Sequence, residues 1–118
     1  MERGLIIRQS WLKKIFNDGK IWEMRSTKTD IRGKIGLIES GSGLIVGEAN
    51  LVDCQKIPTD KNRQRQLYFY HKVDDFELLK KWNWAWILNN VVKYKNPIPY
   101  QHPQGAVIWV KLTTNKPD

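Results

Sequence analysis

Three charged side chains lie close together in the first quarter of the chain. Glu23 and Arg25 alternate with Trp22 and Met24, the pattern of a β-strand with one apolar and one polar face. Lys20 precedes this strand at a glycine corner, near enough to join the two charges. Such a group can form a polar pocket whose charges shift one another's pKa values. The same spacing is typical of a surface ion-pair cluster worth about 0 to 1 kcal/mol, and spacing alone favours that interpretation.

Other common arrangements of catalytic residues are not found in the sequence. One cysteine, Cys54, and two distant histidines, His71 and His102, make no set of metal ligands, so we predict no metal site and no cofactor. No Ser or Cys stands in a strand-turn-helix motif, which argues against a nucleophilic triad. Gly41 and Gly43 predict a hairpin turn, not a phosphate-binding loop. His102 could face a ligand, although a hydrogen-bonded turn histidine is the commoner case.

The charge of the chain indicates an anionic partner. Twenty Lys and Arg against 12 Asp and Glu give a net charge of +8, and residues 61–118 carry +6 of it. A field of this sign attracts polyanions, so nucleic acid is the first candidate. The basic residues of this half form three clusters, at residues 61–65, 80–81 and 93–95, and any one of them taken alone is better explained as a solvated surface that keeps the protein soluble.

Six tryptophans can either fill a core or stack on a base. Trp22, Trp86 and Trp109 lie in apolar or alternating runs, which predicts that they are buried. The others stand near the ends of predicted elements and are free to line a groove, and the sequence does not choose among them: Trp11, Trp82 and Trp84.

The periodicity of the first half predicts one helix among strands. We expect a strand over residues 5–8, then a helix over residues 11–16 with Ser10 as its N-cap. Gly19 can take a positive φ and end that helix. Further strands are expected over residues 22–25, 34–39 and 44–53, the last with a bulge or close backbone approach at Gly47.

The second half predicts two short helices and two strands. A helix is expected to begin at residues 58–60 and to carry residues 61–70, and Asp74 with Glu77 resembles a capping pair ahead of a second helix. Buried strands are expected over residues 85–94 and 106–112, with a proline-rich turn segment over residues 96–105 between them.

These elements predict one domain over residues 1–118, of the α+β class, whose sheet closes into a small β-barrel with short flanking helices. The apolar stretches at residues 5–7 and 106–110 are too short for a signal peptide or a membrane span. A single cysteine gives no internal disulfide. We therefore expect a cytoplasmic protein without a membrane partner.

Three segments of the chain together resemble the ASCH family, the activating signal cointegrator homology domain, which has a PUA-like β-barrel. The family's most specific motif is a glycine corner followed by Lys-x-x-Glu-x-Arg, matched here by Gly19, Lys20, Glu23 and Arg25. Ser10 stands where the family usually has proline. The three segments are residues 4–11, 17–25 and 97–109.

The resemblance implies a cleft beside the barrel, lined by Arg8, Trp11, Lys20, Glu23 and Arg25, that takes RNA, another single-stranded nucleic acid or a nucleoside. In such a cleft Arg8 and Lys20 would neutralise phosphate, Glu23 would accept from an exocyclic amine, and an indole would stack on the base. We accordingly expect a nucleic-acid-binding module, with RNA as the preferred ligand.

The resemblance also implies an alternative, because some ASCH-like proteins are hydrolases that remove the acetyl group from N4-acetylcytidine. Their lysine matches Lys20, but their threonine nucleophile falls at Glu23, and a carboxylate cannot replace the hydroxyl in acyl transfer. A hydrolase for a modified nucleoside or for RNA, with Lys20 and Glu23 as catalytic residues, is the second hypothesis. A module that binds a small molecule or a protein is the third.

Overall fold

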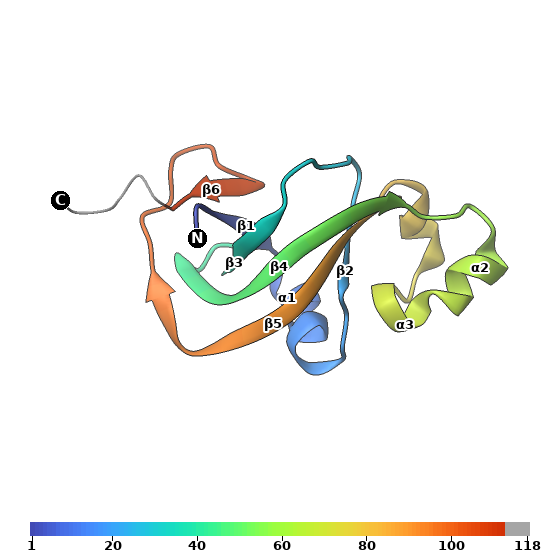
Figure 1. The fold of residues 1–118 in the computed structure, drawn as a ribbon, viewed down its shortest axis with the longest axis horizontal. Helices are drawn as coiled ribbons and strands as arrows, with labels where there is room; N and C mark the ends of the chain where they lie inside the picture. Colours follow the sequence, from blue (N-terminus) through green and yellow to red (C-terminus); the bar gives the residue numbers. More distant parts are fainter. Residues whose placement is uncertain (113–118) are drawn as a thin grey trace.

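One curled sheet with short helices around it forms the protein (Figure 1). The computed structural model describes residues 1–112. The sheet is antiparallel except for one parallel pair, β1 with β3. In chain order the elements are β1 (Arg3–Ile7), α1 (Gln9–Asn17), β2 (Trp22–Arg25), β3 (Gly33–Glu39), β4 (Leu44–Lys56), α2 (Lys61–Gln66), α3 (Tyr68–His71), the 3-10 helix η1 (Phe76–Lys80), β5 (Trp84–Pro99) and β6 (Trp109–Lys111).

The sheet curls into a half-barrel. Its strand order is β2-β5-β4-β3-β1-β6, so β2 and β6 are the two ends of the hydrogen-bonded ladder. Side chains bridge the open side: the Nη2 atom of Arg25 on β2 donates to the carbonyl of Ile6 on β1 at 2.9 Å. The rings of Trp86 and Trp109 also stack, with centroids 5.8 Å apart. The predicted α+β class and PUA-like architecture are confirmed.

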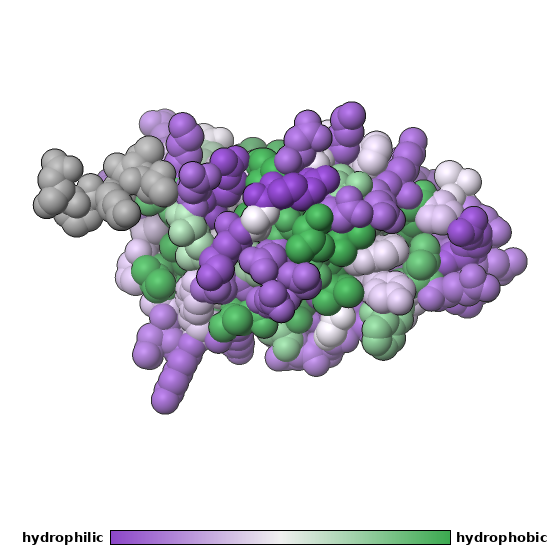
Figure 2. All heavy atoms as spheres, in the orientation of Figure 1, coloured by the Kyte–Doolittle hydropathy of each residue, from purple (hydrophilic) through white to green (hydrophobic). Residues whose placement is uncertain are grey.

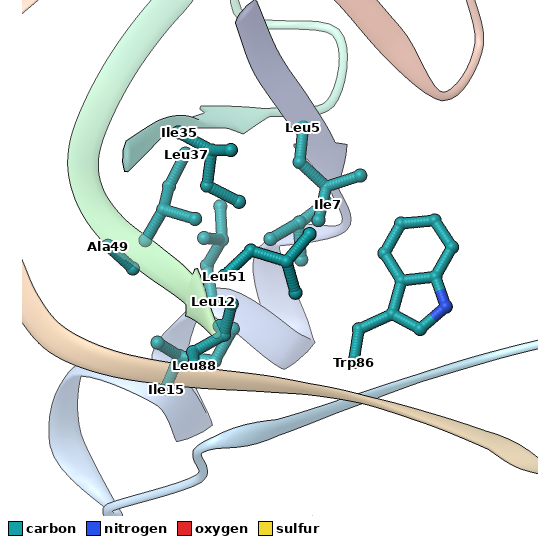
Figure 3. Close-up of a cluster of buried hydrophobic side chains, with 10 residues drawn as sticks. All are labelled: Leu5, Ile7, Leu12, Ile15, Ile35, Leu37, Ala49, Leu51, Trp86 and Leu88. Carbon is teal, nitrogen blue, oxygen red and sulfur yellow. The ribbon is translucent and has the colours of Figure 1, made fainter. Parts of the chain in front are cut away.

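The interior of the curl holds the main core, because the inward-facing side chains of four strands and one face of α1 meet there (Figure 3). Leu12 and Ile15, three residues apart on α1, pack against the sheet as their helical spacing predicts. The predicted burial of Trp86 is confirmed, while Trp22 and Trp109 are half-buried. The cluster comprises Leu5, Ile7, Leu12, Ile15, Ile35, Leu37, Ala49, Leu51, Trp86 and Leu88.

A second core lies at the end of the sheet that carries α2, α3 and η1 (Figure 1). Met24 of β2 and Ala85 of β5 are cross-strand partners within it. Leu79 of η1 and Val73 pack against them, with Ile57. This core packs on the face of β2 that carries Trp22 and Met24, opposite the face that carries Glu23 and Arg25.

The start of α1 differs from the prediction. Arg8 is the N-cap, and Ser10 lies inside the first turn, so the prediction of a Ser10 cap is wrong. The Arg8 carbonyl accepts from the backbone N–H groups of Trp11 and Leu12. No side chain caps the helix, because the guanidinium of the N-cap residue Arg8 has no acceptor for a backbone N–H.

The helical region after β4 also differs in detail. The predicted helix over residues 61–70 is two helices that meet at Leu67, with Asp60 as the N-cap of α2. This break lets the imidazole of His71 reach back to the Gln64 carbonyl, at 2.8 Å from Nε2. Asp75, not Asp74, caps η1, and its carboxylate accepts from the backbone N–H of Glu77.

The last two strands begin and end at other residues than predicted. β5 continues to Pro99, so residues 96–99 of the expected turn are strand, and β6 covers only part of residues 106–112. Beyond Ile87 the edge of β5 opposite β4 has no strand partner among residues 1–112, so prolines there cost no ladder hydrogen bond on that side. None of the helices in this part of the chain has the length and apolar character needed to span a membrane.

Gly47 lies at one of the irregular points of β4, as predicted from the glycine inside this strand. The β4–β5 register shifts between Ile45 and Gly47. A Cβ atom on Gly47 would lie 2.4 Å from the Val92 carbonyl oxygen and 2.8 Å from Cζ of Phe16. Only glycine lets the Phe16 ring of α1 sit this close to the sheet.

Gly47→Ala should therefore lower the free energy of unfolding by about 2 kcal/mol, because backbone and ring must both move. Urea denaturation measures this loss. Gly36→Ala is the matched control: its Cβ would meet a side-chain methyl of Ile45 at 3.2 Å, a contact that can relax, so we expect a smaller loss. Equal losses in the two variants would contradict this account of the close approach.

Candidate functional site

A pocket of about 390 Å³ opens where the curled sheet leaves β1 and β2 without backbone pairing. Its walls come from segments far apart in sequence: β1, the start of α1, β2, the turn after β3, the segment after η1 and the loop before β6. The lining residues are Ile6, Arg8, Trp11, Glu23, Met24, Arg25, Ser40, Gly41, Trp82, His102, Ala106 and Val107. Four of the five predicted site residues are therefore brought together here.

The ion pair of Glu23 and Arg25 forms one wall. Oε2 of Glu23 lies 2.8 Å from Nη2 and 3.0 Å from Nε of Arg25, as the predicted shared face of the strand requires. The Glu23 side chain is 5% exposed and that of Arg25 is 20% exposed. The guanidinium also lies over the Trp86 ring, 5.5 Å from its centroid. With the bond to the Ile6 carbonyl, these contacts fix the group in one orientation.

Each partner of this pair keeps an unused polar atom. Within residues 1–112, no protein group donates to Oε1 of Glu23 and none accepts from Nη1 of Arg25. No buried side-chain nitrogen or oxygen of these residues lacks a partner, so both atoms remain accessible. The wall thus offers an acceptor and a donor to a ligand.

Lys20 lies behind the pocket and not in its lining. Its side chain is 1% exposed, and Nζ donates to the carbonyls of Trp22 at 2.6 Å and His71 at 2.5 Å. Among the described residues it forms no ion pair with Glu23, the one carboxylate of the pocket wall. Nζ lies 4.9 Å from the centroid of the Trp11 ring, so Lys20 contacts the pocket through that indole.

The surroundings of Lys20 weaken its hold on a proton. Burial lowers the pKa of this lysine to about 8, and the charges of Lys14 and Arg25 act in the same direction. The negative charge of Glu23 opposes the shift only in part. The ammonium is held by two carbonyl oxygens without a neutralising carboxylate in contact.

The sequence did not decide which of three tryptophans line the pocket, and in the structure two of them do. Trp11 and Trp82 meet edge to face, with centroids 6.2 Å apart and planes at 86°. Trp84, the cross-strand partner of Arg25, is not one of the lining residues, and Nζ of Lys56 lies 5.9 Å from its ring centroid. The choice depends on how α1 and η1 pack together, which sequence spacing does not encode.

Arg8 supplies the free cation of the site. It is exposed at the N-cap of α1, and its guanidinium pairs with no carboxylate of residues 1–112. The first N–H groups of the helix lie beside it without a side-chain cap. The positive end of the helix dipole and the guanidinium therefore favour an anion at this rim.

His102 and Val107 are lining residues that the sequence did not assign to the site. Nδ1 of His102 lies 2.7 Å from the hydroxyl of Tyr100, and Nε2 lies 2.9 Å from the Ala106 carbonyl. Because a carbonyl only accepts, Nε2 carries the proton and Nδ1 accepts from the tyrosine. The expected hydrogen-bonded turn histidine is thus present, and it shapes the loop that closes one side of the pocket.

The buried Lys20 gives a testable pH dependence of stability. Since the folded pKa is about 8 and the ordinary value is 10.5, the unfolded chain binds the extra proton between these values. The free energy of unfolding contributed by this group therefore rises with pH, by about 2 kcal/mol between about pH 7 and 10. Urea denaturation of wild type and Lys20→Met at both pH values isolates the contribution of Lys20. The rise in the free energy of unfolding from about pH 7 to 10 should be larger in wild type by this amount, because the variant has no amine at position 20. An equal pH dependence in both proteins would refute the assignment.

Comparison with known families agrees with this architecture. The family model of the ASCH domain matches residues 5–98 of the 118 residues, a span that begins within β1 and holds α1 and the whole Gly19 to Arg25 motif. A search of curated proteins returns no match for this chain. The motif lies where the structure builds the Glu23–Arg25 wall of the pocket. By the extent of the match, this chain belongs to the ASCH domain family.

Proposed function

We propose that the protein binds single-stranded nucleic acid, with RNA as the preferred ligand, and holds one nucleotide in the pocket between β1 and β2. One observation carries this proposal: the same pocket joins an indole pair, a buried ion pair with an open acceptor and donor, and an unpaired arginine. These are the groups needed for the ring face, the polar edge and the phosphate of a nucleotide.

The polar wall suits the edge of a base. Oε1 of Glu23 can accept from an exocyclic amine or a ring N–H, and Nη1 of Arg25 can donate to a neighbouring ring nitrogen or carbonyl. Because the pair is fixed by the Ile6 carbonyl and the Trp86 ring, a ligand loses little free energy in ordering it.

The aromatic wall suits the face of the base. Stacking on an aromatic side chain contributes about 1 to 3 kcal/mol per base and tolerates any base. Trp11 is held by the edge of Trp82 and by the Lys20 ammonium, so its ring is positioned before a ligand arrives. A concave pocket of this size accepts a base only from a single strand or from an extruded nucleotide.

The rim and the overall charge suit the phosphates. Arg8 is exposed at the uncapped start of α1, and the net charge of +8 draws a polyanion toward the surface. In this proposal Arg8 neutralises the phosphate, and Lys20 acts by positioning Trp11 because its ammonium is enclosed. Because its ammonium is enclosed, Lys20 is a positioning residue in this proposal and not the phosphate contact expected from the sequence.

Binding is better supported than hydrolysis. The lowered pKa of Lys20 is the feature that favours a catalytic base. However, its Nζ is bound to two carbonyls behind Trp11, and one carboxylate oxygen of Glu23 is occupied by Arg25. The ammonium of Lys20 therefore lacks the free approach to a scissile bond that a nucleophile or base requires, and Glu23 keeps only Oε1 for a ligand.

Arg8→Gln tests the binding proposal. We expect about five- to ten-fold weaker binding of single-stranded RNA, because a charged contact to phosphate is lost. Fluorescence anisotropy over a salt series should also show a slope of log affinity against log salt that is smaller by about 0.7.

Lys95→Gln, which removes the same charge from an exposed position on β5 outside the pocket lining, is the matched control and should keep the wild-type slope. Affinity that does not respond to salt in the wild type, or equal losses in the two variants, would count against the proposal.

A further inference from the structure

The four-residue helix α3 exposes two aromatic rings that no core explains. Phe69 is 67% exposed and Tyr70 is 38% exposed. They belong to residues 65–72, in which Arg65 and Lys72 flank a run of three aromatic residues. Large aromatic side chains in water at neighbouring positions are unfavourable unless a partner covers them. α3 lies beside β2 at the end of the molecule opposite β6 (Figure 1).

These rings are held in place. The Tyr70 ring stacks on Trp22 of β2, with centroids 5.0 Å apart and planes at 19°, and its carbonyl accepts from the backbone N–H of Ile21. Phe69 meets Tyr70 edge to face at 5.4 Å. The next residue, His71, is fully buried and bonded at both ring nitrogens. The exposed pair therefore stands on a rigid base.

One cation contacts this pair and two more line a hollow beside it. Nζ of Lys72 lies 4.8 Å from the centroid of the Phe69 ring. Arg63 and Lys56 line a neighbouring hollow of about 280 Å³ together with Trp22, and no acidic side chain lines it. None of these three cations forms an ion pair within residues 1–112. Figure 2 shows mostly hydrophilic residues over the end of the molecule that carries α2 and α3.

We propose that this aromatic and basic surface around α3, here called the α3 surface, is a second contact for single-stranded nucleic acid, which extends the footprint beyond the one nucleotide in the pocket. It consists of Phe69, Tyr70, Lys72, Arg63 and Lys56. A base stacks on the exposed rings while the cations meet the phosphates on either side. The unpaired positive charge favours a polyanion over an apolar protein face.

The two contacts share one strand. Trp22, which supports Tyr70, is the neighbour in β2 of Glu23, which lines the pocket. The inference rests on the proposed function, since it names a longer ligand for the same protein. It predicts that binding energy grows with strand length, while a mononucleotide uses the pocket alone.

Phe69→Ala tests the second contact, and its 67% exposure makes unfolding of this variant unexpected; thermal denaturation verifies the fold. Fluorescence anisotropy with a labelled single strand of about ten nucleotides should show binding weakened about five-fold or more. A nucleoside monophosphate, followed by calorimetry, should bind as it does to wild type. Phe69→Tyr, which keeps a ring for stacking, should bind the long strand like wild type.

Arg63→Gln gives a second, charge-based readout and should reduce the salt slope of the long strand by about 0.7. Wild-type affinity of Phe69→Ala for the long strand would overturn the α3 contact and leave the pocket standing. Restoration by Phe69→Leu would also overturn it, because an aliphatic contact would then suffice. Long-strand binding that needs Phe69 together with no mononucleotide binding would instead retain α3 and refute the pocket.

Discussion

The position of the Arg25 guanidinium determines the geometry of the pocket between β1 and β2. β1 and β2 make no backbone hydrogen bonds with each other, so the curled sheet would be free to open along this side. Arg25 spans the gap by bonding Glu23 on its own strand and the Ile6 carbonyl on β1. A buried ion pair adds little net stability because both groups lose water, but it admits few geometries. The width and polarity of the pocket follow from that geometry.

The features predicted from sequence were those set by local rules. The alternation of β2 places Glu23 and Arg25 on one face whatever surrounds them, and the close approach at Gly47 follows from a residue without a side chain. The direction of Lys20 was beyond such rules, because Gly19 turns the chain at φ 75° and the ammonium donates a hydrogen bond to the backbone carbonyl of His71, 51 residues away. The choice of Trp11 and Trp82 likewise depends on helix packing.

Charge and aromatic residues act together on both sides of β2. On one side the indole pair and the Glu23–Arg25 wall enclose a small volume, which suits the recognition of a single base. On the other side the α3 surface is open, which suits backbone contact with little dependence on sequence. Arg63 and Lys72 of the α3 surface belong to residues 61–118, the half of the chain that carries most of the excess positive charge.

The indole N–H resonances of ¹⁵N-labelled protein test the central claim most directly. During titration with a nucleoside monophosphate, the signals of Trp11 and Trp82 should shift and saturate together, because both indoles line the pocket. The signal of Trp84, which lies on β5 and is not a lining residue, should keep its chemical shift. Unchanged Trp11 and Trp82 signals, or a saturable shift confined to Trp84, would contradict a nucleotide site between β1 and β2.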